Sequence, residues 1–142
     1  MRAMGETFFS SKEAAEITGC TLRQLQYWRE KGVVVPTVNA TGTGRSIYYS
    51  RSELVELAVM EYLLSVGLSF EAASGILQQL KEFEPDFANQ KIFKRLMLVF
   101  DESVGILKLK DFEKKVAIAF LDQGLPVIPV WLDVIHQKLR SE

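Results

Sequence analysis

The sequence predicts an α+β protein in which a helical N-terminal unit carrying a β-hairpin is followed by a small α/β tail. Capped helical segments fill the first part of the chain, and a glycine-containing hairpin interrupts them. Strand-like and helical segments alternate after residue 90. We expect one domain at residues 7–80, a linker at 81–90 that contains Pro85, and a second, small domain at 91–142.

The composition is that of a soluble globular protein. Of the 142 residues, 48% are hydrophobic and 25% are charged, and no apolar run reaches the length of a membrane span. The segment Met1–Glu6 also lacks the apolar stretch of a secretory signal. We therefore expect a cytoplasmic protein without a membrane partner.

Cysteine and histidine each occur once, as Cys20 and His136. One cysteine excludes an internal disulfide, and the pair leaves too few ligands for a Cys/His zinc site. Cys20 falls in the turn between two predicted helices, with no second cysteine and no nearby histidine, and His136 lies near Trp131 and Leu132 on the last predicted helix. We expect both side chains to pack, and we expect no metal and no cofactor.

Positive charge is concentrated in the first third of the chain. The whole sequence has a net charge of -1, but between Met1 and Arg51 seven basic residues face four acidic ones. This segment therefore has an excess of three positive charges. Its basic residues are Arg2, Lys12, Arg23, Arg29, Lys31, Arg45 and Arg51. A locally basic surface is what contacts with nucleic-acid phosphates require, whatever the charge of the whole chain.

Two short helices joined by a tight turn are predicted at the start of the chain. Ser10 and Ser11 precede a helix that ends at Gly19, and Thr21 precedes a second helix from Leu22 to Lys31. The core face of this second helix is expected to carry Leu22, Leu25 and Trp28, with the stem of Arg29. The opposite face is expected to carry Arg23, Gln24, Gln26 and Tyr27. This arrangement is a helix-turn-helix unit.

A β-hairpin and two more helices follow. Val33–Val35, closed by Pro36, predicts one strand, and Ile47–Tyr49 predicts the other, with Gly42 and Gly44 in the tip between them. A hairpin at this position is a wing. We expect Tyr49 to point inward and Tyr48 outward, because side chains alternate along a strand.

The third helix is expected to begin at Ser50 or Ser52 and to break at Gly67. Ser69 then starts a fourth helix that runs to about Leu80, with Ile76, Leu77 and Leu80 buried. In the tail we expect strands at 96–100 and 104–109, and a helix from Asp111 to Leu121. An edge strand at 127–130, which contains Pro129, and a last helix at 131–140 complete it.

Several short segments stand in an order that resembles one known family. They are Leu22-Arg23-Gln24-Leu25-Gln26-Tyr27-Trp28, Gly42-Thr43-Gly44-Arg45, Tyr48-Tyr49-Ser50 and Leu63-Leu64-Ser65-Val66-Gly67-Leu68-Ser69. Together they resemble the headpiece of MerR-type transcriptional regulators over residues 7–80, in a subgroup like that of actinobacteria. The fold implied is a winged helix-turn-helix.

The resemblance implies a homodimer that places its second helix in the major groove of double-stranded DNA and its wings on flanking phosphates. It also implies action on transcription at promoters, through deformation of the promoter and with RNA polymerase as a further partner. The expected DNA-binding residues are Ser11, Thr21, Arg23, Gln24, Gln26, Tyr27, Thr43, Arg45, Ser46 and Tyr48.

Individual roles follow by position. Arg23 and Gln24 would face base edges or phosphates, and Tyr27 would hydrogen-bond a phosphate. Arg45 would reach the DNA backbone or the minor groove. The chemistry agrees, since arginine pairs with two acceptors of guanine and glutamine pairs with adenine.

The chain departs from the family at three places. Gln26 and Ile47 stand where many members have basic residues. The long coiled-coil helix through which members dimerise is replaced by the tail, after Pro85. We therefore expect dimerisation through the fourth helix or the tail, and the tail is a candidate dimerisation or effector region.

Two other functions are considered. One is an excisionase-like architectural protein that bends DNA for a recombinase, although such proteins are commonly shorter. The other is a protein-interaction module built on a winged helix, which Gln26, Ile47 and the acidic remainder of the chain favour. We do not expect an enzyme, because the sequence has no catalytic triad, no P-loop and no dinucleotide-binding fingerprint.

Overall fold

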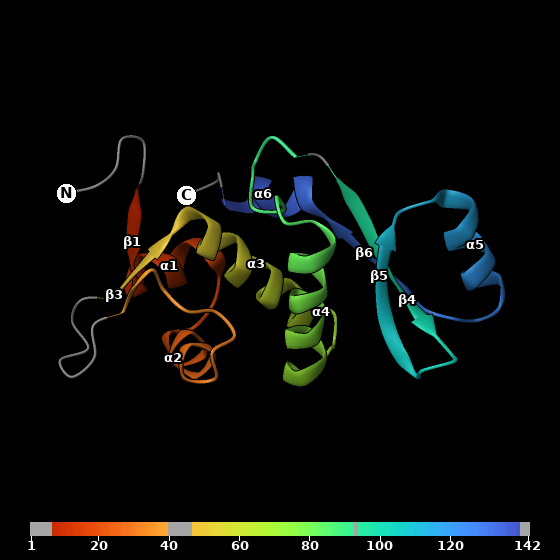
Figure 1. Ribbon diagram of the computed structural model, residues 1–142, viewed down its shortest axis with the longest axis horizontal. Helices are drawn as coiled ribbons and strands as arrows, with labels where there is room; N and C mark the ends of the chain where they lie inside the picture. Colours follow the sequence, from red (N-terminus) through yellow and green to blue (C-terminus); the bar gives the residue numbers. More distant parts are fainter. Residues whose placement is uncertain (1–6, 40–46, 93, 140–142) are drawn as a thin grey trace.

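Four helices in the first half of the chain are each preceded by a serine or threonine that caps them. In this computed structural model, which describes residues 7–39, 47–92 and 94–139, they are α1 (Ser11–Thr18), α2 (Leu22–Glu30), α3 (Arg51–Ser65) and α4 (Phe70–Phe83). The capping residues are Ser10, Thr21, Ser50 and Ser69, and each side-chain oxygen accepts a hydrogen bond from a backbone N–H in the first turn. The predicted helix-turn-helix and the two further helices are present (Figure 1).

A small antiparallel sheet lies beside these helices. Its strands are β1 (Phe8–Ser10), β2 (Val38–Asn39) and β3 (Ile47–Ser50), in the order β1-β3-β2. Tyr49 is buried and Tyr48 is exposed, as the alternation along the strand predicted. The strand β1 has no counterpart in the sequence-based prediction. Elements β1 to α4 are called the headpiece below.

The prediction of a strand at Val33–Val35 is wrong. The backbone N–H groups of Val33 and Val34 both donate to the carbonyl of Trp28, at 2.9 and 3.4 Å. They therefore close the end of α2 instead of joining a ladder. Val34 is completely buried, which accounts for the apolar run that suggested a strand. The hairpin strand β2 begins after Pro36, at Val38.

The second half of the chain forms a three-stranded sheet with two helices. The elements are β4 (Arg95–Asp101), β5 (Ile106–Asp111), α5 (Lys114–Asp122), β6 (Val127–Trp131) and α6 (Leu132–Leu139), here called the tail. The strand order is β5-β4-β6 and both pairings are antiparallel, so β6 is an edge strand as predicted. The α+β class and the order of elements in the tail are confirmed.

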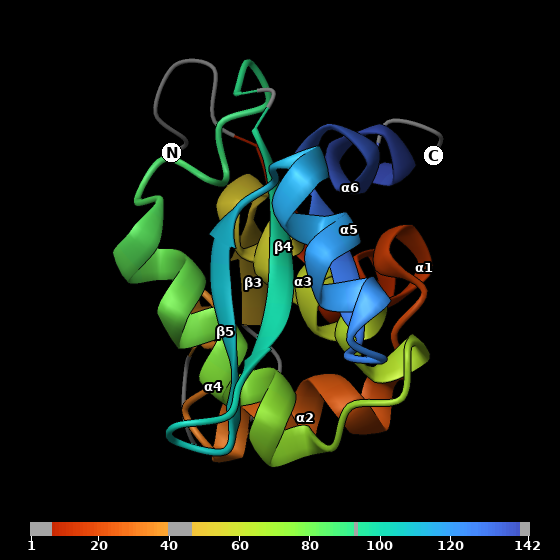
Figure 2. The same cartoon turned by 90° about the vertical axis from the view of Figure 1, so that its right-hand side faces the viewer.

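The tail sheet lies between two layers of helices. Leu96 and Leu98 of β4 belong to the main hydrophobic core, whereas Met97 and Val99 point to the opposite face and pack with Ala117 of α5. Figure 2 shows α5 on one side of this sheet, with α3 and α4 on the other. The helix α5 is therefore outside the main core.

The main core extends through both halves of the chain. Buried residues of α3 such as Leu57 and Leu63 belong to the same cluster as Val130 of β6 and Leu132 and Ile135 of α6. The predicted burial of the α4 positions 76, 77 and 80 is confirmed. Helix α4 continues to Phe83, three residues beyond the end predicted for it.

Side chains of the headpiece bond to both outer edges of the tail sheet. On β5, the amide of Gln79 donates to the carbonyl of Leu107 at 3.2 Å and accepts from the N–H of Leu109 at 3.1 Å. On β6, the hydroxyl of Tyr62 donates to the carbonyl of Pro129. Because β5 and β6 are the edge strands, their outward backbone groups have no neighbouring strand to pair with. The side chains of Gln79 and Tyr62 supply hydrogen-bond partners in place of that strand.

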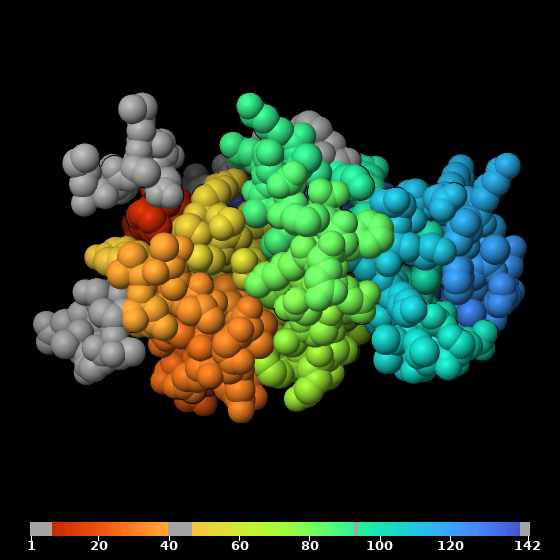
Figure 3. Space-filling view, in the orientation of Figure 1, coloured from red at the N-terminus to blue at the C-terminus, as the bar shows by residue number. Residues whose placement is uncertain are grey.

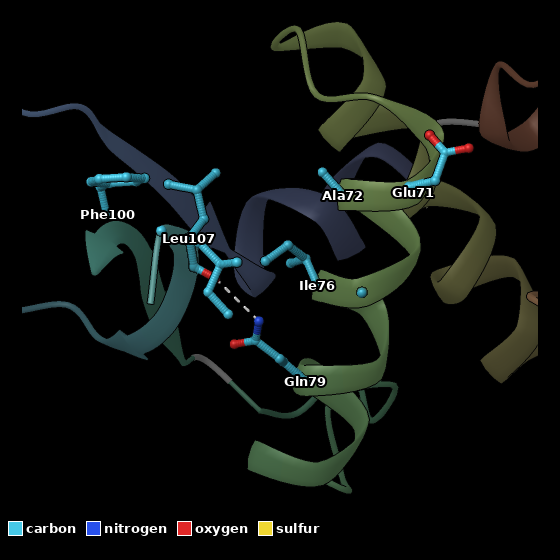
Figure 4. Close-up of a pocket in the computed structure, with 9 residues that line it drawn as sticks. Glu71, Ala72, Ile76, Gln79, Phe100 and Leu107 are labelled. Atoms are coloured by element: carbon cyan, nitrogen blue, oxygen red, sulfur yellow. Dashed lines mark hydrogen bonds between the residues drawn. The ribbon is translucent and has the colours of Figure 1, made fainter. Parts of the chain in front are cut away.

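A groove runs between α4 and the β4–β5 hairpin, with Gln79 on its wall (Figure 4). Its volume is about 370 Å³, and Glu71 is the one charged residue among those that line it. The other lining residues are Ala72, Gly75, Ile76, Gln79, Phe100, Gly105, Ile106 and Leu107. The groove lies outside the residues predicted to bind DNA.

Within the part of the chain that the structure describes, no helix combines the length and the apolar character needed to cross a membrane.

Candidate nucleic-acid interface

Helix α2 has one anchored face and one free face. Leu25 and Trp28 are buried against the headpiece core, whereas Arg23, Gln26 and Tyr27 are exposed. Figure 3 shows the surface of α2, in orange, uncovered by the rest of the described chain in this view. The separation of core and outward residues predicted for this helix is confirmed for these five positions.

Leu22 is an exception to that prediction. Its side chain is 56% exposed, although the spacing placed it on the core face. It is the first residue of α2, and the residues on either side of it, Thr21 and Arg23, are exposed as well.

Thr21 and Gln24 bond to one another at the start of α2. The N–H of Gln24 donates to Thr21 Oγ1 at 3.0 Å, and the N–H of Thr21 donates to Gln24 Oε1 at 2.9 Å. This capping box fixes the beginning of the helix. Two-point pairing with adenine needs both the oxygen and the nitrogen of a glutamine amide, and here the oxygen of Gln24 is already engaged. In this conformation Gln24 offers its N–H groups.

The remaining polar side chain of the exposed face is also held locally. Gln26 Nε2 donates to Glu30 Oε2 at 3.1 Å, one helical turn further along. Arg23 lies on the same exposed face, before Gln26 in the helix. On this face Arg23 therefore supplies the positive charge, whereas the amide of Gln26 is hydrogen-bonded to the carboxylate of Glu30.

Tyr27 is held between two neighbours. The residue is 42% exposed. Its ring meets the ring of Phe70 edge-on with 5.0 Å between centroids, and the ring centroid lies 5.5 Å from Lys31 Nζ. The contact with Phe70 fixes the position of Tyr27 relative to α4. Lys31 adds a cation beside a phenol, a combination suited to a phosphate.

The helix α2 is tied to the hairpin through a buried tyrosine. Arg29 Nη1 donates to the hydroxyl of Tyr49 at 3.4 Å, and burial raises the pKa of that hydroxyl. Tyr48, the next residue along β3, faces the opposite side of the strand and lies across the ladder from Ser10. The exposed Tyr48 is thereby set at a fixed place relative to α2.

The other predicted residues divide into two groups. Ser11 is the first residue of α1 and is partly exposed, while the cap of that helix is Ser10. Thr43, Arg45 and Ser46 lie outside the described residues. Seven of the ten predicted residues therefore lie in the described part of the headpiece, and the roles of all ten stay predictions.

Comparison with known proteins identifies the fold family of the headpiece. Residues 9–80 match the family of MerR HTH regulatory proteins, which is half of the chain. The chain belongs to the MerR family. The match begins and ends close to the span 7–80 in which the sequence resembles that family, so the resemblance is confirmed.

Mycobacterial proteins are similar to this MerR-family chain over a longer stretch. HTH-type transcriptional regulators of Mycobacterium tuberculosis and Mycobacterium bovis are 30% identical to it over 95 residues. The alignments cover 66% of this chain but only 42% of each relative. The chain therefore spans less than half the length of these relatives.

Two residues of the MerR headpiece, Lys31 and Glu53, are absent from the predicted site, although Lys31 was counted among the basic residues of the first third of the chain. Lys31 lies four residues after Tyr27, a spacing that places both on one helix face and could have suggested it. Glu53 accepts from the N–H and the hydroxyl of Thr37, at 2.8 and 2.6 Å, and also from the N–H of Ser50. It therefore fixes the base of the hairpin. The spacing of Ser50 and Glu53 indicates a capping box, but no sequence signal indicates the distant partner Thr37.

Proposed function

We propose that this MerR-family chain is a transcriptional regulator that binds specific sequences of double-stranded DNA at promoters, as a homodimer. The observation that carries the proposal is the free face of α2, which presents Arg23, Gln26 and Tyr27 beside a firmly packed inner face. In helix-turn-helix proteins the second helix enters the major groove, and its exposed side chains reach base edges and phosphates.

Each residue receives a role in this proposal. Arg23 donates to a guanine or to a phosphate, and Gln24 donates its N–H groups to an acceptor in the groove. Tyr27 and Lys31 contact one phosphate together. The remaining contacts to the sugar–phosphate backbone come from Ser11, Thr21, Gln26, Thr43, Arg45, Ser46 and Tyr48.

Action at the promoter depends on the shape of the DNA as well as on contacts. A dimer with two headpieces and two wings bends or untwists the duplex between its half-sites, at an energetic cost that depends on the sequence there. Such a deformation alters the spacing that RNA polymerase meets, which makes the polymerase a second partner.

Selection of genomic fragments bound by the full chain tests the proposal. We expect an inverted repeat to be enriched, and we expect Arg23→Ala to lower the enrichment by at least about tenfold, the value of one good base contact. Lys91→Ala is the matched control, because Lys91 is also exposed but lies in the loop after α4, away from α2. Melting curves check that both variants fold.

The salt dependence of binding then separates the two roles of Arg23. If Arg23 contacts a phosphate, the slope of log affinity against log salt falls by about one in Arg23→Ala, with the preferred sequence unchanged. If it reads a base, the preference at one position relaxes. Equal enrichment by the wild type and Arg23→Ala would contradict this role of α2.

Absence of any enrichment above random DNA would favour the alternative of a protein-interaction module. Exposed Leu22 at the start of α2 is the feature that favours this alternative, since an apolar side chain there suits a protein partner. Enrichment without sequence preference, accompanied by strong bending, would instead indicate an architectural protein of the excisionase kind.

A further inference from the structure

Helix α5 is the least anchored helix of the molecule as described. Of its nine residues only Ala117 is buried, in a small cluster separate from the main core. No side chain caps its start. Isolated helices of this length are unstable in water, so a short helix depends on the surfaces that its side chains bury.

The outward face of α5 is apolar at its centre. Ile118 is 46% exposed and Leu121 is 56% exposed, although Val116, Ala117 and Phe120 already supply the inward contacts with the sheet. A helix that is apolar on both faces is normally covered on both. Within the described chain the tail sheet covers the inward face, whereas Ile118 and Leu121 on the outward face stay exposed.

The charges at the ends of α5 are opposite to those that a single helix favours. Lys114 and Lys115 occupy the first turn and Asp122 is the last residue. The positive end of the helix dipole thus meets cations, and the negative end meets an anion. Within the described residues none of these three side chains forms an ion pair. The one acid at the start of the helix is the exposed Glu113 at the N-cap, whose side chain makes no capping hydrogen bond.

We infer that the outward face of α5 binds the same face of a second copy of the chain, as an antiparallel pair around a two-fold axis. Ile118 is the middle residue of the helix, so the axis passes beside it and the two Ile118 side chains meet. Lys114 and Lys115 of each copy then lie beside Asp122 of the other. The two helix dipoles run in opposite directions, so the positive end of each helix lies beside the negative end of the other.

This inference rests on the proposed function for the homodimer and adds the surface that forms it. Two helices of nine residues are each about 14 Å long, which makes a small interface. We therefore expect a dissociation constant of about micromolar order for the free protein. In Figure 1 α5 lies at the opposite end of the molecule from β1 and β3, so the headpieces lie at the two ends of the dimer.

Sedimentation of the full chain across a concentration series is the first test. Ile118→Lys places two cations at the axis, so we expect the dimer to weaken by at least about tenfold. Val66→Lys is the matched control: Val66 is 41% exposed, similar to Ile118, but lies in the headpiece at the end of α3. It should leave the dissociation constant unchanged.

Charge exchange across the axis is the second test, and it does not depend on a destabilising substitution. Asp122→Lys and the double variant Lys114→Asp with Lys115→Asp each place like charges together in their own homodimer, so each should associate more weakly than the wild type. Mixed in equal amounts, the two variants should form a heterodimer, because every facing pair is then opposite in sign. Both changes also suit the helix dipole, so the folded α5 is not weakened.

The outcomes separate the surface from the proposed function. A wild-type dimer that survives Ile118→Lys and shows no rescue on mixing overturns the α5 interface and leaves the homodimer standing. A chain that stays monomeric at all concentrations contradicts the homodimer as well, while fragment selection reports on DNA binding independently.

Discussion

Burial determines the chemistry of Cys20. The thiol lies in the turn between α1 and α2, donates to the carbonyl of Leu57 at 3.6 Å, and has its pKa raised to about 11 by burial. The reactive and metal-binding form of a cysteine is the thiolate, which is scarce at neutral pH when the pKa is this high. The packing role predicted for Cys20 is confirmed.

We predict that Cys20 reacts slowly with a thiol reagent in the folded protein. Relative to the chain unfolded in urea at the same pH, labelling should be slower by more than about a hundredfold, since both burial and the raised pKa act against it. The rate can be followed by absorbance at neutral pH. Equal rates in the two states would show that the turn opens readily.

Arg95 and Asp133 connect the first strand of the tail to its last helix. The guanidinium donates to both oxygens of the carboxylate, at 3.3 and 2.9 Å, and lies 3.9 Å from the ring centroid of Trp131. The hydrogen bonds from Arg95 lower the pKa of Asp133 from its ordinary value of 3.8. The folded state therefore holds the ionised carboxylate more strongly than the unfolded state does.

The predicted pH dependence follows from that direction. A lowered carboxyl pKa contributes stability that is complete above pH 3.8 and is lost as the pH falls through the folded value. Thermal melting should therefore show Asp133→Asn less stable than the wild type at pH 6, with the difference shrinking below pH 3.8. Glu102→Gln, at an exposed position in the β4–β5 turn, is the control. A difference that stays constant with pH would rule out the ion pair as its source.

Two glycines act on their helices in opposite ways. Gly75 lies inside α4, and a Cβ added there would meet no atom within 4 Å. Gly19 ends α1 with a φ of 80°, a left-handed conformation that side chains disfavour. The first glycine weakens its helix, and the second allows its helix to end.

We predict stability changes of opposite sign for these positions. Gly75→Ala should raise the free energy of unfolding by about 0.5–1 kcal/mol, through helix propensity and a less flexible unfolded chain. Gly19→Ala should lower it by about 1–2 kcal/mol, because alanine resists the left-handed conformation. Urea denaturation of both variants measures the changes. A loss of stability in Gly75→Ala would indicate that α4 bends at this residue.

The main core contains residues from both halves of the chain, so an unfolding experiment can test whether the chain divides into two domains. Division of the chain into domains at 7–80 and 91–142 stays a prediction. One tryptophan, Trp28, is buried in the headpiece, and the other, Trp131, lies in β6 of the tail. Each therefore reports on one half.

We predict a single cooperative unfolding transition. In Trp28→Phe the fluorescence of Trp131 should change at the same urea concentration as the circular dichroism of the whole chain, because buried residues of α3, β6 and α6 share one cluster. Trp131→Phe should behave in the same way. A tail signal that changes at lower urea than the helix signal would contradict this expectation and support independent domains.

Much of the element order could be predicted because the signals are local. Caps such as Ser50 and Ser69, the stop at Gly67, and the alternation of Tyr48 and Tyr49 depend on a few neighbouring residues. Valine runs mislead, because Val34 is buried by closing a helix end and not by a ladder. A three-residue strand such as β1 gives too short a pattern to detect.

The candidate site could be predicted only in outline. Helical spacing placed Arg23 and Tyr27 on the outward face of α2, but not the engagement of Gln24 by Thr21 or the ring contact of Tyr27 with Phe70. Contacts between residues far apart in the chain depend on how the elements pack. The bond from Thr37 to Glu53 is another example, since the two residues are sixteen positions apart in the chain.

The bonds that Gln79 and Tyr62 make to the tail sheet have a consequence for biosynthesis. An open strand edge invites pairing with other chains, and the danger is greatest while a new protein is still folding. Here the residues that occupy the two edges belong to α4 and α3, which precede the sheet in the sequence. The ribosome therefore synthesises Tyr62 and Gln79 before the strands whose edges they cover. The tail sheet can be shielded from aggregation as soon as it emerges.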